Sequence, residues 1–293
     1  MEHFMNFNNS DYINITTDLI YDIFYSDISS RGRISSIRQY SEILIRKILD
    51  IKPNDQVTVG NKAIVNSLKI KSNDNQLIIT ALNKIRKLGN RYTHTQFTGI
   101  VSNTDRITAF DALLDISAFL FVDYFSKYEF EKTPEVMNYF SYLPPELRYK
   151  VLNNLYEMDS SNIAIIDKLC LSIIKFKGGN EAYTWLQEHE NEFKKIPFYV
   201  DDMLPFFKKF MPAELQNRTI YDTCFEKIEK LSAHFAIHGI MYETFEDAIL
   251  YFQSHGKIQS NSPEIVEFND IMELLYIGRR AAKKILKIRR LPN

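Results

Sequence analysis

The sequence predicts an all-α protein made of two helical parts. Apolar residues recur at helical spacing through most of the chain, and glycine and proline separate these stretches at helix-length intervals. No alternating strand pattern is longer than Gln56–Val59. The chain has 293 residues, 45% hydrophobic and 25% charged, which is the composition of a globular protein with a sizeable core. We expect one helical domain over 1–131 (the first part) and another over 132–293 (the second part).

The first part begins with a short and then a long helix. Aromatic and apolar residues at helical spacing predict a helix over Thr17–Phe24. A long helix should begin at Ser29 or Ser30, which are good capping residues, and run to Asp50. Pro53 then prevents continuation, because its ring is incompatible with a helix interior. A loop with one short helix, Lys62–Leu68, should follow.

The stretch Leu82–His94, read LNKIRKLGNRYTH, carries the strongest functional pattern. Asn73, Asp74 or Asn75 offers a cap for the helix that contains it. Placed on that helix, its apolar side chains fall on one side and its polar side chains on the other. The polar side, called the basic ridge below, consists of Asn83, Arg86, Lys87, Asn90, Arg91 and His94. Such a ridge can meet solvent, a partner subunit or a phosphate group.

A strongly apolar helix over Ile107–Tyr128 should close the first part, with Ser102 or Thr104 as its cap. We expect one of its faces to be buried. A boundary is predicted at Lys132–Pro134, and the chain beyond it is again helical. The helices predicted there cover Pro145–Met158, Asn162–Phe176, Glu181–Phe193, Asp201–Phe210, Ile220–His238, Phe245–His255 and Pro263–Arg290.

Charge is unevenly distributed along a chain whose net charge is −1. Arg31 to Arg91 contains 13 basic and 4 acidic residues, a net of +9, whereas Glu131 to Gly278 contains 14 and 23, a net of −9. The last 15 residues contain 7 basic and no acidic residues. The basic segments can contact nucleic acid, or they can dock on the acidic segment of the same chain.

The C-terminal segment is the second basic feature. On a continuous helix its cations would share one broad face that can follow a phosphate backbone. The predicted RNA-binding residues there are Arg279, Arg280, Lys283, Lys284 and Lys287. The alternative is that this helix docks on the acidic region preceding it, because opposite charges lie close in sequence.

Residues 31–128 resemble the HEPN superfamily (higher eukaryotes and prokaryotes nucleotide-binding), in particular its branch found beside restriction, toxin and phage-defence genes. The resemblance is carried by Arg38 and Glu42 on the long helix, and by IRKLGNRYTH over Ile85–His94. It implies a HEPN-like helical bundle. Ribonucleases of this superfamily bring two copies of their motif together across a dimer cleft and cut RNA without a metal ion.

Under this resemblance His94 matches the motif histidine and Asn90 the polar residue before it. The arginine that usually precedes the polar residue is replaced by Gly89, so Arg86 or Arg91 would have to take its role. The resemblance thus implies four catalytic residues, with three more in support. The catalytic set is His94, Asn90, Arg86 and Arg91, and the supporting set is Glu42, Arg38 and Lys87.

The function expected from this pattern is a metal-independent endoribonuclease, or an RNA-binding effector, in phage defence or a toxin–antitoxin system. Its partners would be RNA, a second copy of the chain, and an antitoxin or trigger protein. The alternative is a non-catalytic HEPN-like module that only binds a protein partner.

The remaining features give no further site. We expect no cofactor and no metal, since His234 and His238, one turn apart, have no obvious third ligand. Two cysteines are too few for a disulfide scaffold in a chain of this length. Cys170 lies in an apolar helix, so we expect a buried thiol there. No signal peptide is evident, and the most apolar stretch, Ile116 to Phe125, is too short to cross a membrane. A cytoplasmic location is therefore expected.

Overall fold

The structure is a computed structural model that describes residues 6–93, 95, 97–198 and 217–282. The all-α prediction is confirmed: within those residues the chain forms helices and no strand, apart from one isolated bridge between Pro197 and Thr219. The elements are the 3-10 helix η1 (Asn9–Tyr12), α1 (Ile13–Phe24), α2 (Ser30–Leu49), α3 (Lys62–Lys71), α4 (Gln76–Thr93), α5 (Asn103–Lys127), α6 (Pro134–Phe140), α7 (Pro145–Met158), α8 (Ile163–Phe176), α9 (Gly179–Glu188), α10 (Glu190–Phe193), α13 (Ile220–His238), α14 (Phe245–His255) and α15 (Pro263–Tyr276).

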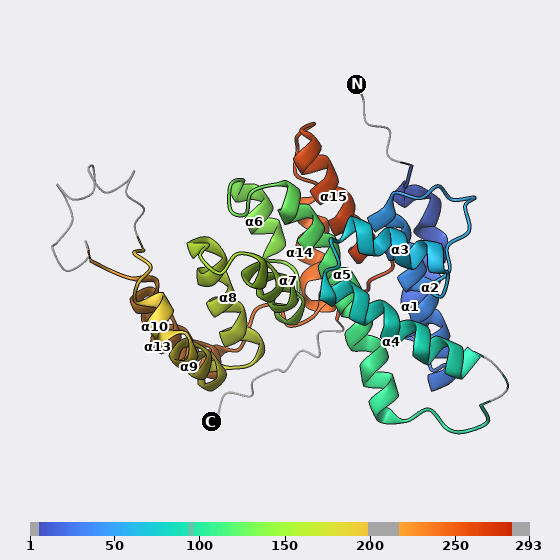
Figure 1. Ribbon diagram of the computed structural model, residues 1–293, viewed down its shortest axis with the longest axis horizontal. Helices are drawn as coiled ribbons and strands as arrows, with labels where there is room; N and C mark the ends of the chain where they lie inside the picture. The colour runs from blue at the N-terminus through green and yellow to red at the C-terminus, as the bar shows by residue number, and fades with distance from the viewer. Residues whose placement is uncertain (1–5, 94, 96, 199–216, 283–293) are drawn as a thin grey trace, which may run out of the picture.

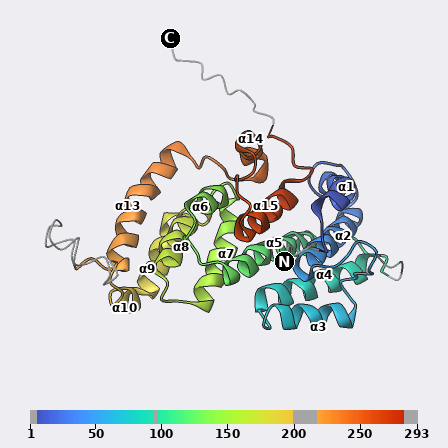
Figure 2. The ribbon, with the colours of Figure 1, turned by 90° about the horizontal axis from the view of Figure 1, so that it is seen from above.

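Helices α1, α2, α4 and α5 form the first part, with α3 at its outer edge against α4 (Figures 1 and 2). Helix α5 is its central element, in contact with both α2 and α4. The face predicted to be buried is covered at Leu113, Leu120 and Tyr124. The rest of the helix surface is buried too, at Phe119 and Val122 for example, because α2, α4, α7 and α15 all contact α5.

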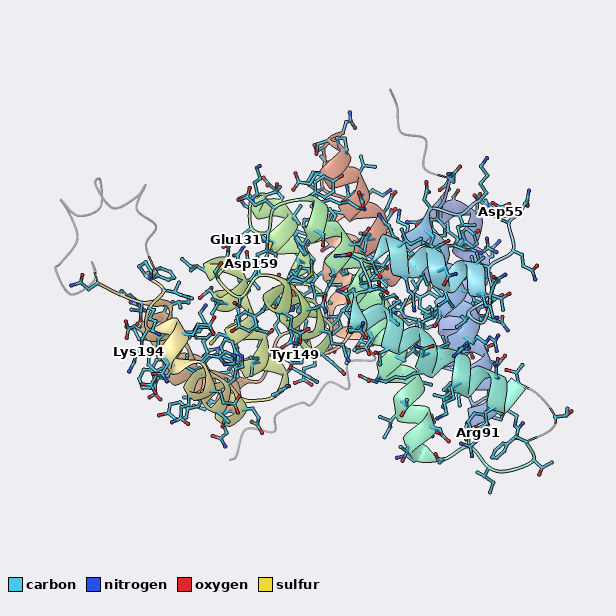
Figure 3. The ribbon with its side chains drawn as sticks, in the orientation of Figure 1. Asp55, Arg91, Glu131, Tyr149, Asp159 and Lys194 are labelled. Atoms are coloured by element: carbon cyan, nitrogen blue, oxygen red, sulfur yellow. The ribbon has the colours of Figure 1, made fainter. Side chains whose placement is uncertain are left out.

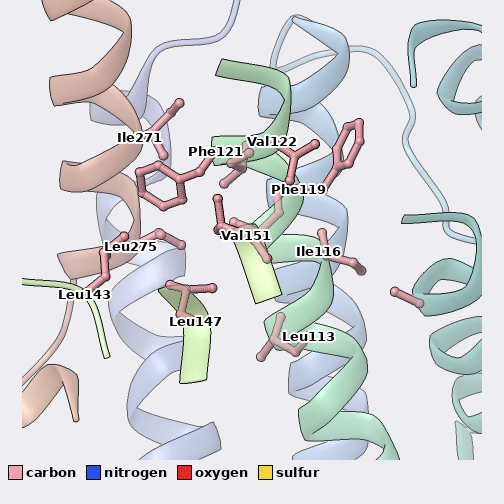
Figure 4. Packing of buried hydrophobic residues seen from close by; sticks show 14 of the residues in the cluster. Leu113, Ile116, Phe119, Phe121, Val122, Leu143, Leu147, Val151, Ile271 and Leu275 are labelled. Atoms are coloured by element: carbon pink, nitrogen blue, oxygen red, sulfur yellow. The ribbon is translucent and has the colours of Figure 1, made fainter. Parts of the chain in front are cut away.

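The second part extends away from this bundle and then returns to it. Helices α7, α8, α9 and α13 pack in succession, and α9, α10 and α13 lie at the end of the molecule opposite α1 to α4 (Figures 1 and 2). Helix α15 then comes back to α5, where Phe268 contacts Phe121 at 6.1 Å and Tyr124 at 5.4 Å between ring centroids. Phe121 also packs on Phe140 of α6. Buried apolar side chains therefore form one core across residue 132 (Figure 4).

Most predicted helix starts are confirmed by their caps. The side chains of Ser29, Asn75 and Ser102 accept backbone N–H groups at the starts of α2, α4 and α5. The first helix was predicted too short. It begins at Ile13, because η1, capped by Asn8, leads directly into it.

Two predictions in the second part need correction. The helix predicted over Glu181–Phe193 is interrupted at His189, where α9 ends and α10 follows. The helix predicted over Pro263–Arg290 ends at Tyr276. Gly278 has a φ of +73°, and a Cβ there would lie 2.8 Å from the Thr17 Cα, so this turn and its close approach to α1 both require glycine. The helix predicted over Asp201–Phe210 lies outside the described residues.

In the described ranges, no helix is both long and apolar enough to cross a membrane.

Candidate nucleic-acid interface

The basic ridge lies on the outer side of α4, as its periodicity predicts. The helix buries Ile78, Leu82, Ile85 and Tyr92 against α2 and α5. The ridge members Asn83, Arg86, Lys87, Asn90 and Arg91 are exposed. His94 lies outside the described residues. Arg91 marks the C-terminal end of α4 at the edge of the first part (Figure 3). The two faces of α4 are therefore those that the sequence predicts.

Gly89 is the point at which a second helix contributes to the ridge. Arg38 of α2 lies across it and donates a 3.0 Å hydrogen bond from Nη1 to Asn90 Oδ1. A Cβ on residue 89 would lie 2.7 Å from Arg38 Cδ and 3.0 Å from Nη1. The absence of a side chain at Gly89 thus makes room for the Arg38 guanidinium beside Asn90. An arginine therefore does lie beside Asn90, but it belongs to α2 and not to α4.

Glu42 holds Arg38 in this position. Its carboxylate lies 3.7 Å from Arg38 Nε, one helical turn along α2, and it accepts a 3.2 Å hydrogen bond from the Val59 backbone N–H. Burial raises the pKa of the Glu42 carboxyl. The hydrogen bond from the Val59 backbone and the charge of Arg38 lower that pKa, but by less. Both side chains are mostly covered, with Arg38 17% and Glu42 23% exposed. The guanidinium is therefore held more firmly than that of an ordinary surface arginine.

Arg86 and Arg91, the two candidates for the missing arginine, have different surroundings. Arg91 forms an ion pair with Asp105 at 3.6 Å, and its guanidinium lies 4.3 Å from the centre of the Phe97 ring. Arg86 is exposed and has no hydrogen bond or ion pair with a described residue, as is the case for Lys87. Arg86 and Lys87 are thus available to an external anion, whereas Arg91 is already paired.

A cluster of contacts holds the C-terminal end of α4 and the segment after it. Arg31 donates hydrogen bonds to the carbonyl oxygens of Tyr92, Phe97 and Gly99. The Tyr92 hydroxyl donates to the Asp105 carboxylate. This hydrogen bond holds the pKa of the Asp105 carboxyl below its usual value, and Arg91 acts in the same direction. The chain is therefore anchored on both sides of His94.

Removing the Tyr92 hydroxyl tests this cluster. Tyr92→Phe should lower the free energy of unfolding by about 1.5 kcal/mol near neutral pH, because Asp105 loses a charge-assisted hydrogen bond. A lowered folded-state pKa stabilises the fold above the usual carboxyl pKa, about 4, and this stabilisation is lost as the pH falls through the lowered value. The difference between variant and wild type, measured by urea unfolding, should therefore shrink in acid. Tyr12→Phe is the control, since the buried Tyr12 hydroxyl has no hydrogen-bond partner among the described residues. An equal effect in both variants would contradict the assignment.

The described part of the basic tail, 279–282, is not helical and does not continue α15. Arg279 is 6% exposed, pairs with Glu246 at 3.3 Å, and lies 4.1 Å and 4.3 Å from the ring centres of Phe24 and Phe245. Arg280 lies over the Tyr21 ring at 4.4 Å. Arg279 thus docks on an acidic residue of the second part, Glu246, as in the alternative interpretation of this segment. Lys283, Lys284 and Lys287 lie outside the described residues.

The other candidate residues named from the sequence are two histidines and a cysteine in the second part. The rings of His234 and His238 are 4.7 Å apart on α13, and the described residues contain no group of three or more side chains suited to hold a metal ion. Cys170 is fully buried, and its thiol faces the Cys224 carbonyl oxygen.

Comparisons with protein-family models, with curated proteins and with solved structures find no match for this chain. The geometry of α2 and α4 is therefore the basis on which a function can be proposed.

The ridge can be recognised from the sequence, whereas Arg38 has only a supporting role there. A glycine in the interior of an amphipathic helix signals that another group approaches the backbone closely. Gly89 was therefore a usable signal, but only the packing of α2 on α4 shows which side chain takes that place.

Proposed function

We propose that the chain is a metal-independent endoribonuclease that binds the RNA phosphate backbone on the surface formed by α2 and the basic ridge of α4. The observation that carries this proposal is the Arg38 guanidinium, held over Gly89 and against Asn90. Arg86 lies on the same exposed side and has no hydrogen bond or ion pair with a described residue, and Lys87 beside it is exposed as well. Guanidinium groups that are fixed in place and cations that are free suit a polyanion.

In the proposed reaction, arginines bind the phosphate and the histidine transfers a proton. Arg38 and Arg86 hold the scissile phosphate and offset charge that develops on its oxygens. The 2′-hydroxyl of the preceding ribose attacks the phosphorus, and the 5′-oxygen leaves, which gives a cyclic phosphate and a free hydroxyl. His94 removes the proton from the nucleophile or supplies one to the leaving oxygen, since its ordinary pKa is near neutrality. Asn90 orients the phosphate or the imidazole.

A second copy of the chain would complete the site. Cleavage needs both a base and an acid, and the resemblance to the HEPN superfamily implies two motifs facing each other across a dimer. The context suggested by the same resemblance is phage defence or a toxin–antitoxin pair in the cytoplasm. An antitoxin or trigger protein would then act through the second part, which shares a core with α5.

A non-catalytic interaction module is the second candidate. Gly89 favours it, because the motif arginine is absent from α4 itself. The two proposals differ in one measurable property: the module would not cleave RNA.

The test of RNA binding uses Gly89→Ala and Arg38→Ala. A methyl group at residue 89 would lie 2.7 Å from Arg38 Cδ, so the Arg38 side chain must move and lose its hydrogen bond to Asn90. The higher helix propensity of alanine, up to about 1 kcal/mol, offsets this loss, so the fold should be retained. Affinity for fluorescein-labelled single-stranded RNA, measured by anisotropy, should nevertheless fall about tenfold in both variants. The slope of log affinity against log salt should become shallower by about one in Arg38→Ala.

Lys195→Ala is the matched control, since Lys195 is exposed in the second part and has no ion pair with a described residue. It should bind RNA like the wild type. Equal RNA affinity in the wild type, Gly89→Ala and Arg38→Ala would refute the assignment of this surface.

A further inference from the structure

A cavity of about 660 Å³ lies between the two parts of the chain, on the side of α5 where α14 and the segment after α15 meet it. Phe24, Tyr40 and Lys84 line it from α1, α2 and α4, and Glu146, Phe245 and Arg279 from the second part. Its volume is that of a pocket for a drug-sized molecule. Phe110 and Leu114 of α5 add to a mostly apolar lining.

One polar group in the lining has no hydrogen-bond partner among the described residues. It is the buried hydroxyl of Tyr40, a residue that is 1% exposed. Burial raises the pKa of Tyr40 to about 12, so the hydroxyl stays protonated and can donate or accept a hydrogen bond. Buried polar groups in proteins are normally satisfied. The hydroxyl has almost no accessible surface, so a ligand in the cavity reaches it only if the Tyr40 side chain turns toward the cavity.

The charges of the lining leave an excess of carboxylate. Both cations are paired: Lys84 with Asp111 at 3.2 Å, and Arg279 with Glu246 at 3.3 Å. The two remaining carboxylates, Glu146 and Glu243, have no ion pair with a described residue. Glu146 is half-buried, and burial raises the pKa of its carboxyl. The charge of Lys150 lowers that pKa, but no ion pair forms between them, so a partly buried carboxylate remains that favours a cationic ligand.

The aromatic residues suit the same ligand class. Phe24 and Phe110 lie in the lining with their ring centres 5.8 Å apart. The faces of Phe24 and Phe245 already hold one cation, the Arg279 guanidinium. Because Arg279 occupies these faces, the rings provide apolar surface for the body of the ligand, and its charge must lie away from them, toward Glu146 and Glu243.

From the cavity, its mostly apolar lining and the two carboxylates that form no ion pair with a described residue, we infer a binding site for an organic cation with an apolar body and a protonated amine. The body occupies the apolar lining between α1, α5 and α14, and the amine faces Glu146 and Glu243. A ligand held there contacts both parts of the chain. This site is separate from the RNA surface and does not depend on it.

The test uses three probes that share an aromatic body and differ in charge: 2-naphthylmethylamine, 2-naphthylmethanol and 2-naphthoate. Each is titrated into the full chain by isothermal calorimetry. The amine should bind about tenfold more tightly than the alcohol, and the carboxylate most weakly. In the double variant Glu146→Gln, Glu243→Gln, the advantage of the amine over the alcohol should disappear. Glu188→Gln is the matched control, an exposed carboxylate on α9 without an ion pair to a described residue.

Blocking variants locate the probe. Leu114→Trp fills the cavity and should abolish binding of the amine, and Thr108→Trp does so from a partly exposed position where folding is less at risk. Thermal unfolding shows which of the two retains its fold. Equal binding of amine and alcohol, or preference for the carboxylate, would overturn the ligand class. Absence of binding by all three probes, or binding that persists in a folded blocking variant, would overturn the site.

Discussion

Replacing His94 with alanine is expected to lower the rate of RNA cleavage by at least about 100-fold, because a positioned acid or base contributes that factor or more. RNA affinity should change little, since the cations that contact the phosphate remain: Arg38, Arg86 and Lys87. The measurement is the initial rate of cleavage of a fluorescein-labelled RNA, resolved on a gel, alongside anisotropy for binding. Reactions are run in the presence of a chelator, because the proposed mechanism uses no metal ion.

Three proteins are needed to interpret that experiment: wild type, His94→Ala, and the Lys195→Ala control. Expression in cells, with growth and RNA integrity followed together, supplies the same comparison where a cellular trigger is present. RNA cleavage by the wild type and Lys195→Ala but not by His94→Ala supports the nuclease. Cleavage at equal rates by all three would exclude His94 as the catalytic group. Tight RNA binding without cleavage by any of them would instead identify an RNA-binding protein.

Phe121→Ala is expected to have the largest effect on stability, about 3 to 5 kcal/mol, because a fully buried aromatic side chain leaves a cavity that the surroundings fill only in part. Phe121 of α5 contacts Phe140 and Phe268, which come from beyond residue 132. The loss should therefore destabilise both parts together. Phe176→Ala, at a position 40% exposed, should cost much less.

The single tryptophan allows the two parts to be compared. Trp185 lies on α9 in the second part, whereas circular dichroism reports all helices. If the shared core makes the chain one cooperative unit, Phe121→Ala should move the fluorescence and dichroism transitions in urea by the same amount. A shift in dichroism alone, with the tryptophan transition unchanged, would show that the two parts unfold independently, as separate domains at the predicted boundary would.

The positions of the helices and their exposed faces could be read from the sequence because both depend on near neighbours. Apolar spacing, capping residues and helix breakers act within a few residues, and the predicted bounds Pro145–Met158, Ile220–His238 and Phe245–His255 match α7, α13 and α14. The same local pattern placed Asn90 and Lys87 on the exposed side of α4. The resemblance to the HEPN superfamily and the role of His94 remain predictions.

Contacts between residues far apart in the chain were decided by the tertiary structure alone. Arg38 and Asn90 are 52 residues apart, and no periodicity in either helix indicates that the guanidinium would lie over Gly89. Likewise Phe121 and Tyr124 of α5 meet Phe268 only because α15 returns to that helix, and the Arg279 side chain is covered only because the chain turns at Gly278 towards α1. Local spacing determines which way a side chain points from its own helix, whereas its partner depends on how the helices pack, and that packing placed an arginine beside Asn90.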